Sequence, residues 1–155
     1  MKQFELTYIA YNDNGSGINN LLKTIYTIIT LIIGFTHYLI RVKMYSPLIY
    51  ILVSIFIFVV IIIYGTISNL PKGVSFLDTQ FFYDEYYELD LTEEKREKML
   101  AQIIVNIIDS TNKLSNLATK RGKVLRSMQF FTILALSLLG LSLLEYLSYL
   151  PIGII

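Results

Sequence analysis

Polar side chains recur at every third or fourth position in the middle of the chain, at Asn106, Asp109, Asn112, Lys113 and Asn116. This spacing places them on one face of a helix. If copies of that helix assembled, the ribbon of amides and carboxylates would bind a small polar signal or set the register between helices, as a buried asparagine can. The alternative is a solvated helix face, which is the norm for amphipathic helices.

A basic cluster follows the ribbon and leads into a leucine-rich segment. Its members are Lys120, Arg121, Lys123 and Arg126. At the mouth of an assembly, these side chains would bind a phosphate-bearing ligand. The alternative is an anchor that holds the helix end on the cytoplasmic side of a membrane and touches anionic lipid headgroups.

A second polar face lies in an apolar segment nearer the N-terminus. Thr30, Gly34 and His37 share one side of a helix with Lys23 and Arg41. The spacing of Thr30 and Gly34 predicts close packing against another helix, and a pore lining is the alternative. Because the segment holds no second histidine and no acid, we do not expect His37 to belong to a proton relay.

The last apolar segment carries three further positions of interest, Ser137, Gly140 and Glu145. Ser137 and Gly140 are small enough to face another helix closely. Glu145 lies beside tyrosines, which is typical of the aromatic belt at a membrane interface. In an oligomer, Glu145 would instead form an acidic ring at the outer mouth, a feature that favours cations.

Motifs for catalysis are missing from the sequence. It contains no phosphate-binding loop, dinucleotide fingerprint, histidine–acid metal constellation or nucleophile elbow. With no cysteine there are no thiolate ligands or nucleophiles. A net charge of +1 gives no case for nucleic acid as a partner. We therefore expect a protein that is not an enzyme and that uses no metal and no cofactor.

Composition identifies the class of protein. The chain has 155 residues, of which 54% are hydrophobic and only 16% are charged, against roughly a quarter charged in soluble domains. Three segments are apolar enough to cross a bilayer, which takes about 20 residues. They are Thr24–Ile40, Met44–Pro71 and Ser127–Leu147.

The distribution of basic residues predicts an orientation. With the N-terminus in the cytoplasm, every lysine and arginine except Arg41 and Lys43 lies on the cytoplasmic side, as the positive-inside rule requires. The C-terminus is then external, and the lipid bilayer expected is the inner (plasma) membrane of a bacterial cell. The predicted segments are a cytoplasmic N-terminal segment (1–20), a membrane hairpin (21–71), an acidic aromatic cytoplasmic linker (72–91), a cytoplasmic amphipathic helix (92–126), the third transmembrane helix (127–147) and an external tail (148–155).

The N-terminal segment alternates between apolar and polar residues. Over Lys2–Ile9 this pattern favours a short strand, which could pair with Val74–Tyr83; interfacial or loop structure is the alternative. The polar run Asn12–Gly17 is typical of a turn or linker.

From residue 91 onward the periodicity becomes helical, and Asp90 with Glu93 has the spacing of a capping box. Only Gly122 interrupts this helix before the third span. One side of it carries an apolar stripe that includes Leu100, Ile104, Ile107, Leu114, Ala118 and Leu125. Such a stripe must be buried, and little other cytoplasmic chain is available to cover it. The stripe therefore predicts self-association, as an oligomeric coiled coil or as a bundle with the residues before it.

The run from Asn106 to Lys123, followed by a leucine-rich span, resembles small membrane effectors of bacterial antiphage systems, including the SLATT-type and Pycsar-type families. The resemblance covers about residues 100–147. It implies oligomerisation and disruption of the membrane when infection is signalled. Two departures are clear, since those families typically have two spans and this chain has no recognisable nucleotide-sensing domain.

Together these observations predict an all-α membrane protein with three transmembrane helices, the third continuing from the long amphipathic helix. The expected function is a homo-oligomeric, channel-like or membrane-disrupting effector, triggered by a cytoplasmic sensor protein or a small signalling molecule. The alternative is a non-conducting anchor that recruits or inhibits a cytoplasmic partner through Phe81–Leu91 and the long helix.

Overall fold

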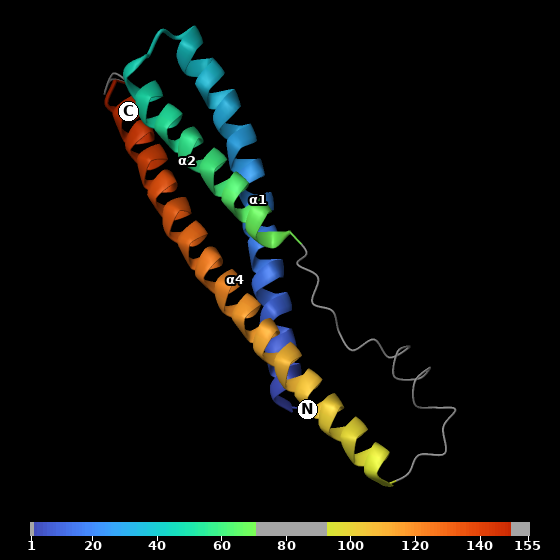
Figure 1. Cartoon of the computed structure of the whole chain (residues 1–155). Coiled ribbons are helices and arrows are strands. Elements are labelled where there is room, and N and C mark those ends of the chain that lie inside the picture. The colour runs from blue at the N-terminus through green and yellow to red at the C-terminus, as the bar shows by residue number, and fades with distance from the viewer. Residues whose placement is uncertain (1, 71–92, 150–155) are drawn as a thin grey trace. The chain divides into compact units, whose positions relative to one another are not determined.

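The computed structural model describes residues 2–70 and 93–149, which form three helices and no strand (Figure 1). The helices are α1 (Lys2–Arg41), α2 (Ser46–Asn69) and α4 (Glu93–Tyr149). Each contains a stretch long and apolar enough to cross a membrane. For the described residues, the prediction of an all-helical chain with three potential spans is therefore confirmed.

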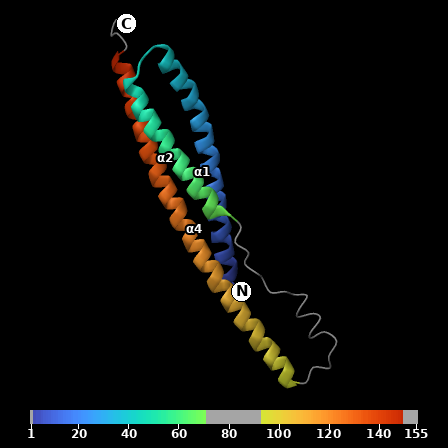
Figure 2. The ribbon, with the colours of Figure 1, turned by 45° about the horizontal axis from the view of Figure 1, so that its top comes forward.

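The chain divides into two compact units, one made of residues 14–70 and 121–155 and the other of residues 1–13 and 71–120. The first unit, which we call the bundle, holds the C-terminal part of α1, all of α2 and the C-terminal part of α4. In the bundle α2 runs antiparallel to the other two helices, as Figure 2 shows.

Contacts between α1 and α4 keep one register along the bundle. Asn14 lies against Gly122, Gly17 against Leu125, and the Tyr38 and Tyr146 hydroxyls are 3.2 Å apart at a separation of 108 positions. The same separation holds at all three levels, so the two helices run parallel without slipping. Each α1 position from 14 to 38 is therefore level with the α4 position 108 residues later.

The core of the bundle is apolar and draws on all three helices. Its fully buried members include Ile18, Ile25 and Leu39 of α1, Ile51 and Phe58 of α2, and Met128 and Ala135 of α4. With Leu22 and Ile32, the buried positions of α1 lie three, four or seven residues apart, which is the spacing of one helix face. That face meets α2 and α4, so the opposite side of α1 is turned away from both.

A tight turn joins α1 to α2. The Met44 amide donates to the Leu39 carbonyl and the Lys43 amide to the Ile40 carbonyl, which is the pairing of a Schellman motif. Lys43 occupies the left-handed position of that motif at φ 59°. Pro47 then lies in the first turn of α2, where a proline removes no helical hydrogen bond.

The predictions for the N-terminal segment are wrong. Lys2–Ile9 is helical, not a strand, and Asn12–Gly17 lies inside α1 instead of forming a turn. The two glycines of that run permit close helix packing. A Cβ atom on Gly15 would lie 2.9 Å from the Arg121 guanidinium, and one on Gly17 would lie 2.9 Å from Leu125. Val74–Tyr83 and the capping residue Asp90 lie outside the described residues.

In the second unit the described residues are the helical segments 2–13 and 93–120. Leu114 and Ala118 are buried there. The start of α4 is exposed on every side from Glu93 to Lys98. Gly122 does not break α4, which is continuous from Glu93 to Tyr149.

Candidate functional site

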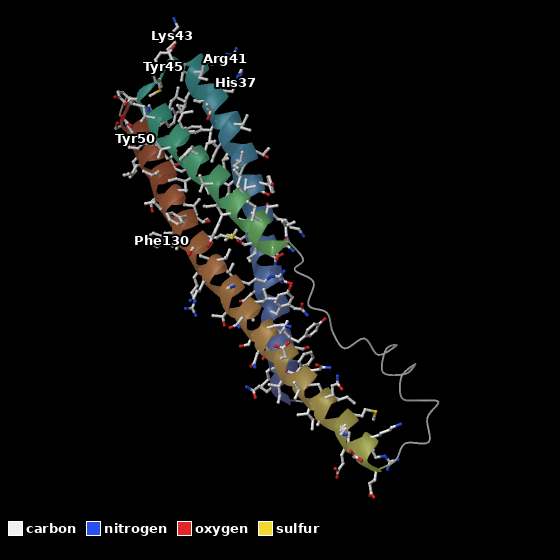
Figure 3. All side chains as sticks on the ribbon, in the orientation of Figure 1. His37, Arg41, Lys43, Tyr45, Tyr50 and Phe130 are labelled. Carbon is white, nitrogen blue, oxygen red and sulfur yellow. The ribbon has the colours of Figure 1, made fainter. Side chains whose placement is uncertain are left out.

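The most unusual surface of the bundle is the side of α1 that faces away from α2 and α4. It carries exposed polar or small residues at a spacing of three or four: Lys23, Thr27, Thr30, Gly34, His37 and Arg41. We call this surface the outward polar face of α1. His37 and Arg41 both point away from the other helices (Figure 3). Helical spacing places these residues on one face, and in the structure that face is turned away from α2 and α4.

Gly34 shows that this face has no partner among residues 2–70 and 93–149. A Cβ atom built on Gly34 meets nothing within 4 Å, whereas one on Gly65 would lie 2.6 Å from Met128. A helical glycine costs about 1 kcal/mol relative to alanine. At Gly65 close packing offsets this cost. At Gly34 no contact with the described residues offsets it. Thr30 and Gly34 therefore do not pack against α2 or α4.

The threonine hydroxyls of the face are satisfied locally. Thr27 donates to the Lys23 carbonyl at 3.1 Å and Thr30 to the Tyr26 carbonyl at 3.0 Å. Bonding of this kind lowers the cost of exposing a threonine to lipid. The residues that an apolar environment would penalise are therefore the imidazole of His37 and the two cations.

Glu145 does not lie on an open surface. Ser46 of α2 donates a hydrogen bond to Glu145 Oε1, which links the start of α2 to the end of α4. Glu145 Oε2 and Thr36 Oγ1 are buried without a hydrogen-bond partner among the described residues. In the single chain, the carboxylate is thus part of an interhelical contact at the loop end of the bundle.

The basic cluster separates into one bound and three exposed side chains. Arg121 donates to the main-chain carbonyl of Asn69 at 3.4 Å, where a cation offsets the negative end of the α2 dipole. Asn69 also donates to the Asn19 side chain at 2.7 Å. Lys120, Lys123 and Arg126 are exposed. Arg121 therefore joins helices, while the other three remain available to a membrane surface or an anionic ligand.

The polar ribbon of α4 has the character of a solvated face. Asp109, Asn112 and Asn116 are exposed and Asn106 is half-buried. Asp109 forms a 2.6 Å ion pair with Lys113 one turn further along the same helix. Because this ion pair stays within one helix, the described residues do not gather the ribbon into a polar ring.

The apolar stripe of α4 is covered along only part of its length. Leu114 and Ala118 are buried, and Leu125 is half-buried where it meets Gly17. Leu100 and Ile104 are 50% and 56% exposed, and Ile107 is 39% exposed. The part of the stripe that remains open to a further partner therefore lies nearer the beginning of α4.

On the C-terminal part of α4, Ser137 and Gly140 are exposed as well. Ser137 donates to the Ile133 carbonyl of its own helix at 2.9 Å, and a Cβ atom on Gly140 would meet nothing within 4 Å. Their large exposed neighbours, including Ile133 and Leu144, are apolar. This face differs from that of α1 because it carries no charge.

Several interhelical contacts were not anticipated from the sequence. Ser54 donates to the Ala135 carbonyl at 3.1 Å, and Ser142 donates to the Pro47 carbonyl at 3.0 Å. Both serines are fully buried. Ser54 interrupts the apolar run of α2 four residues before Phe58, and such a small polar residue in a span is a signal that could have revealed the contact.

The bundle also has shallow apolar grooves, and neither suits a polar ligand. One of about 280 Å³ lies between α1 and α4 and includes Ile28, Phe35 and Leu143 in its walls. Another of the same volume lies between α2 and α4 beside Tyr64 and Phe131. No group of three or more histidine or acidic side chains within residues 2–70 and 93–149 could hold a metal ion.

No family model, curated protein or solved structure matches this chain.

Proposed function

We propose that this chain is a homo-oligomeric integral membrane protein that permeabilises the bilayer, as a membrane-disrupting or channel-like effector of bacterial or prophage defence. The outward polar face of α1 carries the proposal. Polar and charged side chains within a membrane span normally face protein or water, and here α2 and α4 lie on the other side of the helix. Further copies of the chain would supply the missing surroundings.

Two parts of the chain support assembly. The exposed apolar residues Leu100, Ile104 and Ile107 offer a contact outside the membrane-crossing segments. Within those segments, the outward polar face of α1 lies open at Gly34, and copies of the chain arranged around a common axis would enclose it. We propose that the homo-oligomer covers the apolar stripe and encloses this polar face.

The membrane and orientation belong to the proposal too. All lysines and arginines except Arg41 and Lys43 lie in segments other than the turn between α1 and α2. This distribution supports insertion in a bacterial inner membrane with the N-terminus of the chain in the cytoplasm. The exposed Lys120, Lys123 and Arg126 would then meet anionic headgroups. The trigger would be a cytoplasmic sensor protein or a small signalling molecule acting on the exposed polar ribbon of α4.

A second candidate function is a non-conducting anchor that recruits or inhibits a cytoplasmic partner. The exposed apolar side of α4 at Leu100, Ile104 and Ile107 favours it, because a protein partner would cover the same surface. The two functions differ in one observable, since only the effector changes the permeability of the membrane.

A permeability assay in bacterial cells tests the proposal. Overproduction should depolarise the membrane and admit a small dye. Thr30→Leu combined with His37→Leu should reduce this leakage strongly because it removes the polar surface. Val59→Leu on the exposed apolar side of α2 is the matched control and should leave leakage unchanged. Full insertion with normal membrane potential and growth would contradict the effector and favour the anchor.

Assembly can be tested separately through the exposed stripe. Ile104→Asp combined with Ile107→Asp places two charges on a surface that would be buried between copies, where they have no partner. Chemical cross-linking in detergent should then yield monomers. Asn112→Asp on the solvated ribbon is the control and should preserve the oligomer. An unchanged cross-linking pattern in the double variant would show that assembly does not use this surface.

A further inference from the structure

We infer that the outward polar face of α1 lines the conduction path of the assembly and that the path selects small anions. The inference rests on the proposed function, because it requires several copies arranged around a water-filled axis. It goes further by naming the helix face, the charge of the permeating ion and the residues that set the selectivity.

The first observation is the sign of the charge on this face. It carries Lys23 near its start, Arg41 at its end and His37 between them, and all three are exposed. No acidic residue occurs in α1 after Asp13. A path walled by copies of this face would therefore be lined by cations and neutral groups.

The second observation concerns spacing along the helix. Eighteen positions separate Lys23 from Arg41, which at 1.5 Å per residue is about 27 Å. The hydrocarbon layer of a bilayer is about 30 Å thick. The two cations therefore mark both edges of that layer. In a ring of identically oriented copies, equivalent residues lie at one depth, so each mouth receives a ring of positive charge.

The third observation concerns Glu145, whose negative charge would oppose selectivity for anions. An acidic ring of Glu145 would favour cations, as the sequence suggests. In the bundle, however, Glu145 accepts a hydrogen bond from Ser46 of α2, and its second oxygen is buried. Glu145 is thus held between α2 and α4, away from the outward face of α1. Rings of lysine and arginine are the feature that pores use to favour anions.

The other helices offer no comparable lining among the described residues. The exposed side of α2 is apolar, with Leu52, Phe56 and Ile63 each more than half exposed. The exposed side of α4 at Ser137 and Gly140 differs from the outward polar face of α1 because it is uncharged. Because the Thr27 and Thr30 hydroxyl protons are bonded to carbonyls of α1, the charges of Lys23 and Arg41 set the selectivity.

Reversal potentials across a planar bilayer test the inference. The full chain is reconstituted in phosphatidylethanolamine and phosphatidylglycerol, with a potassium chloride gradient across the membrane. The wild-type reversal potential should lie between zero and the equilibrium potential of chloride. Lys23→Glu combined with Arg41→Glu should move the reversal potential toward the equilibrium potential of potassium, because the double variant replaces both positive rings with negative ones. These side chains are exposed, so the bundle should retain its helical content.

Lys43→Glu is the matched control. It makes the same charge change in the turn after α1, outside the outward polar face, and should shift the reversal potential much less than Arg41→Glu does. A cation-selective wild type, or a double variant that keeps chloride selectivity, would overturn the inference while leaving the proposed function standing. If the reconstituted protein gives no current, both the proposed function and this inference are wrong.

Discussion

Helices α1 and α2 belong to one bundle, yet their outward faces differ in chemistry. Phe56 and Leu52 of α2 are 69% and 62% exposed, and every exposed residue of α2 from Leu52 to Ile63 is apolar. The corresponding side of α1 carries Thr30, Gly34 and His37 between two cations. The inward faces are much more alike, because each is mainly apolar and includes a glycine in close interhelical contact. The difference teaches that the bundle is complete on its inside, whereas the outside of α1 still requires protein or water.

The largest effect is expected when a charge is placed on the apolar outward side of α2, and this substitution tests the difference between the two helices. Val59→Lys places an ammonium group near the middle of the apolar side of α2, at a cost of roughly 2.5–3.5 kcal/mol for membrane insertion. Thr30→Lys makes the equivalent change on the outward polar face of α1 and should be tolerated far better, because that face meets protein or water in the assembly. Both positions are exposed in the single chain. The measurement is the fraction of each variant that resists alkaline extraction from membranes.

The wild-type chain and Val59→Leu serve as references for expression and insertion. Equal loss of Val59→Lys and Thr30→Lys from the membrane fraction would mean that both faces meet lipid. The distinction between α1 and α2 would then be of no functional consequence, and the polar face would lose its role in assembly.

Substitutions at two glycines test the difference between the inward and outward faces of the bundle. Gly65→Leu forces a side chain into the space of Met128, which is itself 1% exposed. Overpacking of this kind lowers the free energy of unfolding by about 1–3 kcal/mol. Gly34→Leu meets open space among the described residues, so in the monomeric background of Ile104→Asp with Ile107→Asp it should leave the free energy of unfolding unchanged or slightly higher. Thermal unfolding followed by circular dichroism separates the two variants, and a similar loss in both would place Gly34 in an internal contact.

The sequence predicts helices best where composition alone decides. The run from Met44 to Pro71 contains no lysine, arginine, histidine or acid, so only a helix can satisfy its backbone in lipid. The predictions for the N-terminal segment are wrong for the opposite reason. Its glycines and asparagines have strong local preferences for turns, and those preferences are overridden by the contacts that Gly15 and Gly17 permit with α4.

The direction in which a polar residue points is harder to predict. Helical spacing places Thr30, Gly34 and His37 on one face, but only the contacts of α1 with α2 and α4 show that this face is outward. Arg121 and Lys120 are neighbours in the basic cluster, yet only Arg121 reaches the end of α2. Such distinctions depend on interhelical register, which a single sequence does not specify.

The smallest effect is expected from substitutions at two serines, one buried inside the bundle and the other exposed on its surface. Ser54 is buried and donates to the Ala135 carbonyl on α4 as well as to the Tyr50 carbonyl on its own helix. Ser54→Ala should therefore destabilise the bundle by roughly 0.6 kcal/mol, the average for an interhelical hydrogen bond in a membrane. Ser137 is exposed and donates only to its own helix, at the Ile133 carbonyl. Ser137→Ala removes no contact between helices, so its free energy of unfolding should equal that of the wild type. Reversible unfolding in mixed detergent micelles resolves a difference of this size, and equal stability of the two variants would show that the buried Ser54 contact contributes nothing beyond the local hydrogen bond.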